Sequence, residues 1–144
     1  MMTDKKKMGA GMILHVITVI VTAVGLFLYL QNCKTSYFSN MGVNTTVVAC
    51  LAASAVLEIL MIVLSLKMGA KPFLDIIPVA CGVMTALAAI QFIGSRIAGA
   101  ASIMTFENNA ENMADLNGAI TAMAVCVIAL VCVWITSFFK VVKE

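Results

Sequence analysis

Four long apolar stretches constrain the fold of this chain more than any other feature of its sequence. Each holds about 20 residues, which is the length that an α-helix needs to cross the ~30 Å hydrocarbon core of a bilayer. They cover residues 11–30, 46–66, 73–95 and 118–139. Their apolar character is continuous rather than alternating, which excludes the strands of a membrane β-barrel. The sequence therefore predicts an all-α membrane protein, a single domain over 1–144 that forms an antiparallel bundle of four transmembrane helices.

The composition supports the same class. Hydrophobic residues make up 62% of the 144-residue chain and charged residues 11%, whereas soluble domains are about half apolar and a quarter charged. So few charges could not keep so much apolar surface in water. The formal net charge of +2 is too small, and too evenly spread, to indicate binding to nucleic acid. The lipid bilayer is thus the first expected partner.

The basic residues predict the orientation of the bundle. If the N-terminus lies inside, seven of the nine lysines and arginines are cytoplasmic, and only Lys34 and Arg96 lie outside. The seven are Lys5, Lys6, Lys7, Lys67, Lys71, Lys140 and Lys143. Cytoplasmic loops of membrane proteins carry such an excess of positive charge. We therefore expect a multi-pass protein of the cytoplasmic membrane with both termini inside and with outer loops at 31–45 and 96–117.

Glu58 is the acidic residue that lies deepest in a predicted span. It precedes Leu66 by eight residues, which places it about 12 Å from the inner end at 1.5 Å per residue. A charge at the bilayer centre costs ~2.5–3.5 kcal/mol on insertion scales, so such residues usually face the bundle interior. Thr22 and Thr85 lie at a suitable depth to hydrogen-bond it. Glu58 is thus a candidate for proton or cation coupling, or else a protonated acid that fixes helix packing.

His15, the single histidine, is another possible partner of Glu58. It lies about 6 Å from the inner end of its span. Helical side chains lean toward the N-terminus of their own helix, so His15 leans inward and Glu58 leans outward. A direct pair between the two side chains therefore requires tilted helices.

The second outer loop contains a run of acidic and amide residues. If the run is helical from an N-cap at Thr105, three carboxylates spaced by four form one stripe. The stripe is Glu107, Glu111 and Asp115, with Asn108 and Asn112 beside it and an apolar edge at Phe106, Ala110 and Met113. Like charges one turn apart cost stability, which favours a face that docks a partner protein. A solvated helix and cation binding are the alternatives, and Arg96 begins this candidate partner-binding segment.

The five cysteines predict neither a disulfide framework nor a metal site. Four of them, Cys50, Cys81, Cys126 and Cys132, lie within spans, where cysteine behaves as a small hydrophobe. Cys33 lies in the first outer loop, where we expect a free thiol accessible from outside. The chain has no CxxC pair and no ligand set that includes the histidine. We accordingly expect no metal, no cofactor and no catalytic residues.

Three stretches carry a resemblance to a known group of proteins. They are residues 30–42 (LQNCKTSYFSNMG), 96–116 (RIAGAASIMTFENNAENMADL) and 137–144 (SFFKVVKE). Together they resemble uncharacterised small four-helix membrane proteins of anaerobic gut Firmicutes, encoded near membrane-anchored family 3 glycoside hydrolases. The resemblance implies a bacterial cell membrane and a surface glycosidase as one candidate partner. It transfers no catalytic residue, because no activity is established for the group.

Two functions of different classes follow from the sequence. The first is a non-enzymatic accessory or scaffold subunit that anchors or organises a partner protein in the membrane. The alternative is a small transporter or channel that uses Glu58 for proton or cation coupling. Four short helices could form such a pathway only as a homo-oligomer whose protomers share it.

Overall fold

A computed structural model describes residues 7–69, 71–139 and 141–143 of the chain. Four long helices make up most of it: α1 (Ala10–Asn32), α2 (Thr45–Met68), α3 (Ile76–Thr105) and α4 (Ala110–Thr136). Two short 3-10 turns, η1 (Ser39–Met41) and η2 (Pro72–Asp75), precede α2 and α3. Strands β1 (Lys7–Met8) and β2 (Val142–Lys143) form a small antiparallel pair next to the ends of the chain.

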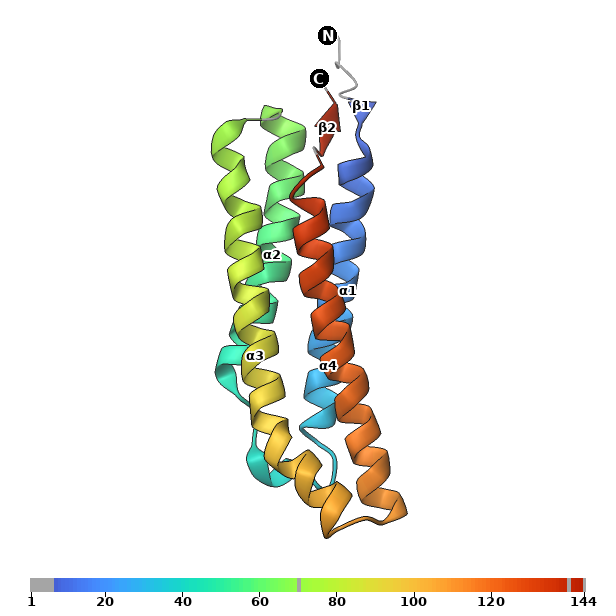
Figure 1. Ribbon diagram of the computed structural model, residues 1–144. Coiled ribbons are helices and arrows are strands. Elements are labelled where there is room, and N and C mark those ends of the chain that lie inside the picture. The colour runs from blue at the N-terminus through green and yellow to red at the C-terminus, as the bar shows by residue number, and fades with distance from the viewer. Residues whose placement is uncertain (1–6, 70, 140, 144) are drawn as a thin grey trace.

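The four helices stand side by side, and each runs opposite to the next along the chain (Figure 1). Contacts join α1 to α2, α2 to α3, α3 to α4 and α4 back to α1, so the bundle is closed. Both ends of the chain lie at one end of the bundle, together with β1, β2 and the α2–α3 turn (Figure 1). We call this the terminal end. The opposite end, with η1 and the α3–α4 turn, is the loop end.

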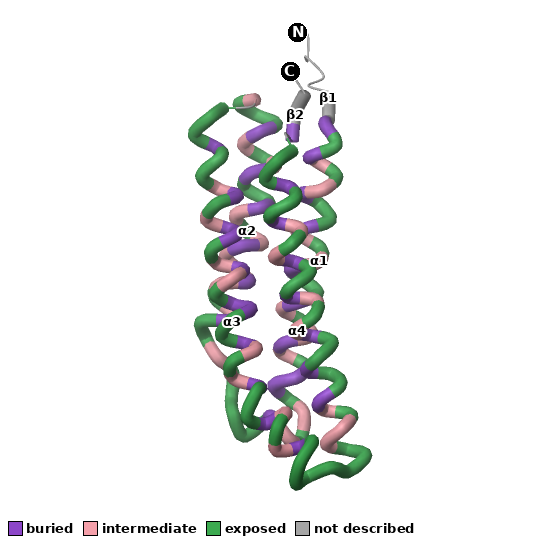
Figure 2. Tube along the Cα trace, in the orientation of Figure 1, coloured by how far each residue is buried: buried purple, intermediate pink, exposed green. Residues whose placement is uncertain are grey.

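All four helices are long and apolar enough to cross a membrane, which confirms the predicted all-helical, multi-pass class. Their outward faces are apolar: Ile13 is 65% exposed and Ile90 is 66% exposed. Polar side chains lie inside the bundle instead. Along each helix, buried and exposed residues alternate with the helical period (Figure 2). A soluble bundle has the reverse arrangement, with its apolar stripe facing the core. The outer surface therefore suits contact with lipid.

The structure moves two predicted boundaries at the loop end. The third span was expected to end at Ser95, but α3 continues to Thr105, and α4 begins at Ala110 rather than at residue 118. Most of the predicted second outer loop is therefore helical, and Thr105 ends a helix instead of capping one. Asn109 is the N-cap, because its side-chain oxygen accepts the backbone N–H of Asn112 at 2.8 Å.

The bundle interior is divided into layers along its length. A packed apolar cluster, which we call the middle cluster, includes Tyr29, Leu51, Phe92 and Cys126. A second cluster at the loop end contains Phe38 and Ile103. On the other side of the middle cluster, toward the terminal end, several polar side chains are fully enclosed, among them Ser54, Glu58, Thr85 and His15, and a third apolar cluster contains Met61, Leu74 and Val141. The candidate site lies in this part of the interior.

Candidate functional site

Glu58 and His15 form a direct pair inside the bundle. The Nδ1 atom of His15, on α1, hydrogen-bonds the Oε2 atom of Glu58, on α2. Both side chains have an exposed fraction of 1%. The sequence suggested that such a pair needed tilted helices. The positions of α1 and α2 relative to each other along the bundle axis also decide whether the two side chains meet. Figure 1 shows the α2–α3 turn level with β1, beyond the start of α1, which brings the two side chains to one depth.

Three buried polar atoms around this pair have no hydrogen-bond partner among the described residues. They are His15 Nε2, Glu58 Oε1 and Thr22 Oγ1. A buried polar group without a partner costs about 1–3 kcal/mol. The pair thus satisfies one atom of each side chain and leaves the other atom of each able to bind a proton, a water or a ligand.

The threonines expected near Glu58 have different positions. Thr85 bonds the Ser54 hydroxyl at 2.9 Å and donates to the Cys81 carbonyl oxygen at 2.7 Å. No hydrogen bond joins it to Glu58 in the described structure. Thr22 is fully buried, and its hydroxyl lacks a partner among the described residues. The Ser54–Thr85 bond, which sequence reasoning missed, ties α2 to α3 with neutral groups only.

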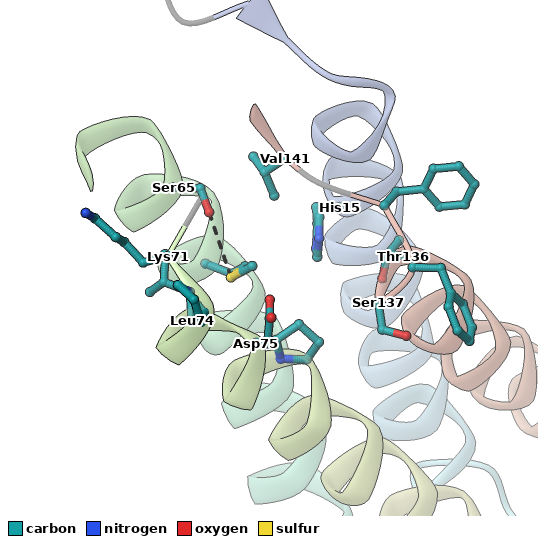
Figure 3. Close-up of a pocket in the computed structure, with 13 residues that line it drawn as sticks. His15, Ser65, Lys71, Leu74, Asp75, Thr136, Ser137 and Val141 are labelled. Atoms are coloured by element: carbon teal, nitrogen blue, oxygen red, sulfur yellow. Dashed lines mark hydrogen bonds between the residues drawn. The ribbon is translucent and has the colours of Figure 1, made fainter. Parts of the chain in front are cut away.

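A cavity of about 300 Å³ lies between the helices at the terminal end. His15 forms part of its inner wall, and Ser65, Asp75, Thr136 and Ser137 add polar atoms around it (Figure 3). Lys71 lies at its rim, and apolar walls come from Met61, Leu74, Pro78 and Val141. The cavity therefore leads from this end of the bundle toward the His15–Glu58 pair. Asp75 was not among the residues singled out from the sequence.

The cavity hydroxyls donate their hydrogens to acceptors of the protein. Thr136 donates to the Val133 carbonyl oxygen at 2.9 Å, and Ser137 donates to the Trp134 carbonyl oxygen at 2.6 Å. Ser65 donates weakly to the sulfur of Met61 at 3.9 Å. A hydroxyl has one donor and two acceptor positions, so these oxygens are left with acceptor positions only.

Arg96 lies at the opposite end of the interior and is 1% exposed. Its Nε donates to Asn32 Oδ1 at 2.9 Å, and its two terminal nitrogens contact Ser95 Oγ at 3.2 Å and Cys33 Sγ at 3.3 Å. The guanidinium carbon also lies 4.8–5.8 Å from the ring centroids of Phe38, Phe92 and Tyr29. No carboxylate among the described residues forms a salt bridge with it. Neutral acceptors and aromatic faces therefore enclose this charge.

The predicted accessibility of Cys33 is wrong for this structure. The residue is 5% exposed, because it packs in the middle cluster and accepts a hydrogen bond from Arg96. Arg96 lies nine residues before the last residue of the 30-residue helix α3, and nothing in the sequence indicated that its side chain would contact the first outer loop. The five cysteines are free thiols, and no group of three metal-ligating side chains occurs among the described residues.

The predicted acidic stripe is also divided. Glu107 lies in the α3–α4 turn, whereas Glu111 and Asp115 lie on α4. Asp115 accepts the backbone N–H of Tyr37 at 3.0 Å, so it joins the two outer segments to each other. Phe106, Glu107 and Asn108 are exposed at the tip, Glu111 is exposed beside them, and Asn112 and Met113 are half-buried. A three-residue acidic helix face is therefore not present.

A comparison with protein-family models, with curated proteins and with solved structures finds no match to this chain.

Proposed function

We propose that this chain is a small proton-coupled membrane transport protein in which the His15–Glu58 pair is the coupling group. The observation that carries the proposal is the pair itself: two ionisable side chains, fully buried within membrane-length helices, hydrogen-bonded to each other beside a cavity. Intramembrane ionisable groups that pair in this way mark proton relays and ion pathways. The pair supplies two such groups in contact, which a single buried glutamic acid would not.

A purely structural role explains the pair less well. The same bundle already ties α2 to α3 through the neutral Ser54–Thr85 bond, which avoids placing ionisable groups in the interior. The His15–Glu58 pair instead leaves His15 Nε2 and Glu58 Oε1 without partners. Replacing a buried ion pair by apolar residues is often neutral or stabilising. The presence of this ionisable pair in the interior is therefore better explained by proton binding than by packing.

The proton would be exchanged at His15 Nε2. In one state Nδ1–H donates to the Glu58 carboxylate, Nε2 is bare, and the pair carries one net negative charge. Uptake of one proton at Nε2 gives an imidazolium beside a carboxylate, and the net charge becomes zero. Histidine suits this exchange because its charge changes near physiological pH. No side chain has to leave its hydrogen bond for the proton to arrive.

The orientation and assembly form part of the same proposal. The excess of lysine at the terminal end favours a cytoplasmic position for that end and for the cavity. Four helices enclose the pair, and the packed middle cluster lies between the pair and the loop end in the part of the chain that the structure describes. We therefore propose that the protein works as a homo-oligomer in the cell membrane, with transport occurring where protomers meet.

The single histidine allows a direct test of proton binding. The chain would be purified with a tag that contains no histidine and labelled with nitrogen-15 in the imidazole ring, so that the NMR signals report only His15. We expect Nε2 to take up a proton reversibly as the pH falls through roughly 8 to 4, while Nδ1 keeps its hydrogen. A ring that holds one protonation state over this whole range would refute the proposal.

Two variants make the titration specific to the pair. Glu58→Gln keeps a hydrogen-bond acceptor near His15 but removes the charge that the imidazolium would face, so its titration curve must differ from that of the wild type. Glu111→Gln removes a carboxylate that is exposed at the loop end, and we expect it to leave the curve unchanged. Equal curves for wild type and Glu58→Gln would show that Glu58 does not act on the exchanged proton.

An accessory role is the second candidate function, and one observation favours it. Met104 and Phe106 are 67% and 85% exposed at the tip of the loop end, next to Glu107 and Glu111. An apolar tip bordered by acidic groups suits contact with a partner protein such as a surface glycosidase. Replacing Phe106 and Met104 by serine should then release a partner that co-purifies with the wild type, without changing the His15 titration.

A further inference from the structure

We infer that the terminal-end cavity binds small protonated alkylamines, and that such a cation competes with the proton for the His15–Glu58 pair. The inference rests on the proposed function and adds the chemical class of the substrate to it. Four properties of the cavity carry the argument: the hydrogen-bonding character of its polar atoms, its charges, its apolar walls and its contact with an unpartnered buried atom.

The hydrogen-bonding groups of the cavity favour a donor. Ser65, Thr136 and Ser137 direct their hydrogens to the sulfur of Met61 or to carbonyl oxygens of their own helix. In these rotamers their oxygens present lone pairs, which can accept bonds from a ligand. His15 Nε2 is also an acceptor when Nδ1–H donates to Glu58. An alkylammonium ion has N–H donors and no acceptor, so it is complementary to this set.

The charges around the cavity favour a cation. Asp75, from η2, lies on its wall, and Glu58, from α2, lies behind His15 on α1. In its unprotonated state the pair adds one net negative charge. Lys71 at the rim is the one lysine or arginine that lines the cavity among the described residues, and it extends away from the interior in Figure 3. Thr136 at the end of α4 and the lining residues after it, Ser137 to Phe139 and Val141, are not ionisable.

The walls and the size of the cavity favour an alkyl group. Met61, Leu74, Pro78 and Val141 provide apolar surface, which gains free energy when a short carbon chain leaves water. A volume of about 300 Å³ corresponds to roughly ten waters at ~30 Å³ each. This leaves room for an ion of a few heavy atoms that keeps part of its hydration. Met61 and His15 both line the cavity, and the unbranched Met61 side chain can move to admit the ion to Nε2.

Competition follows from the charge balance at His15. The unprotonated pair has a bare Nε2 and a net negative charge, and it can accept an N–H from the ammonium group. After proton uptake Nε2 carries a hydrogen and the net charge of the pair is zero, so the cation loses its acceptor at Nε2 and its attraction to the pair. One proton therefore leaves the pair for each cation that binds. This exchange would couple the movement of an amine to that of a proton.

The test uses ethylammonium chloride with the purified full-length protein in detergent. Binding is followed by titration calorimetry and proton release by a pH indicator in weak buffer. We expect saturable binding, release of up to one proton per chain, and about tenfold weaker affinity per pH unit below the His15 titration, as mass action requires. Tetramethylammonium, which has no N–H donor, and sodium at the same ionic strength should release none.

Two variants separate the parts of the argument. Glu58→Gln should lose the proton release, because the pair no longer becomes negative. Asp75→Asn, outside the pair, should fold normally and weaken ethylammonium binding by at most about fivefold, the range for an exposed ionic contact. Equal binding of tetramethylammonium, or binding of ethylammonium without proton release, would overturn the inference. If His15 titrates but ethylammonium does not bind, this inference fails while the proposed proton site stands.

Discussion

The packing of Gly99 against the first outer segment gives a stability prediction with an internal control. A Cβ atom added at Gly99, in α3, would lie 3.0 Å from a ring carbon of Phe38 and 3.2 Å from one of Tyr37. A Cβ atom at Gly94, five residues earlier in the same helix, would meet nothing within 4 Å. Ordinary carbon contacts are about 3.5–4.0 Å. Gly99→Ala must therefore displace both rings by several tenths of an ångström, whereas Gly94→Ala displaces nothing.

The magnitude follows from the difference between the two variants. Both gain whatever alanine contributes over glycine inside a helix, up to about 1 kcal/mol in water. Only Gly99→Ala adds overpacking, which typically costs 1–3 kcal/mol. The displaced Phe38 ring also faces the Arg96 guanidinium, and loss of that contact would add about 0.5–1 kcal/mol. We therefore expect Gly99→Ala to be less stable than Gly94→Ala by about 1–3 kcal/mol if only overpacking contributes, and by up to about 4 kcal/mol if the contact with Arg96 is also lost.

The assay is reversible unfolding in mixed detergent micelles, with helical circular dichroism as the signal and both variants measured beside the wild type. A double variant tests the cause, because Phe38→Leu shortens the ring that the new Cβ meets. If the ring contact causes the loss, Gly99→Ala should cost less in the Phe38→Leu background than in the wild type. Equal stability of Gly99→Ala and Gly94→Ala would refute the close packing of the loop end.

Three further predictions concern other parts of the bundle. Cys33 should react with a membrane-impermeant maleimide only after unfolding, whereas a cysteine introduced at the exposed Lys34 should react at once; fast labelling of Cys33 in the folded protein would contradict its burial. Glu58→Ala, which leaves His15 without its partner, should destabilise the fold by about 3–5 kcal/mol, and Glu58→Gln by less, measured by the same unfolding assay. Asp115→Asn weakens the acceptor for the Tyr37 N–H and should cost up to about 1.5 kcal/mol, while Glu111→Gln should stay within about 0.5 kcal/mol.

The helices could be predicted from the sequence because hydropathy depends on local composition. Their ends at Thr105 and Ala110 could not, since a charged residue such as Arg96 ends an apolar window but does not end a helix. The guanidinium stays buried because Asn32 and the rings of Tyr29 and Phe38, all from distant segments, enclose it together with Phe92 of its own helix. The sequence predicted an N-cap at Thr105, whereas α4 begins after Asn109. Asparagine is the stronger N-cap residue of the two.

The candidate site could be predicted only in part. Its position within a predicted span identified Glu58 as a candidate. Its pairing with His15 depended on how far α2 extends past the start of α1, and no local sequence pattern indicates that distance. Thr85 has a suitable depth, yet it bonds Ser54 because that hydroxyl lies closer across the α2–α3 contact. Asp75 lines the cavity together with residues of α1, α2 and α4, which come from distant parts of the sequence. Each of these positions is a tertiary property.

The separation of the two buried charged groups constrains how the proposed transport could work. The His15–Glu58 pair communicates with the terminal end through the cavity, while the middle cluster lies between the pair and the loop end. Beyond that cluster, Arg96 places a fixed positive charge across the remaining interior, and such a charge opposes the passage of protons and cations. A static route through one chain is therefore closed. Release of the transported ion on the other side requires either movement of the helices around the middle cluster or a path between protomers. Proton binding at His15 changes the net charge of the buried pair, and this change would alter the energy of either event.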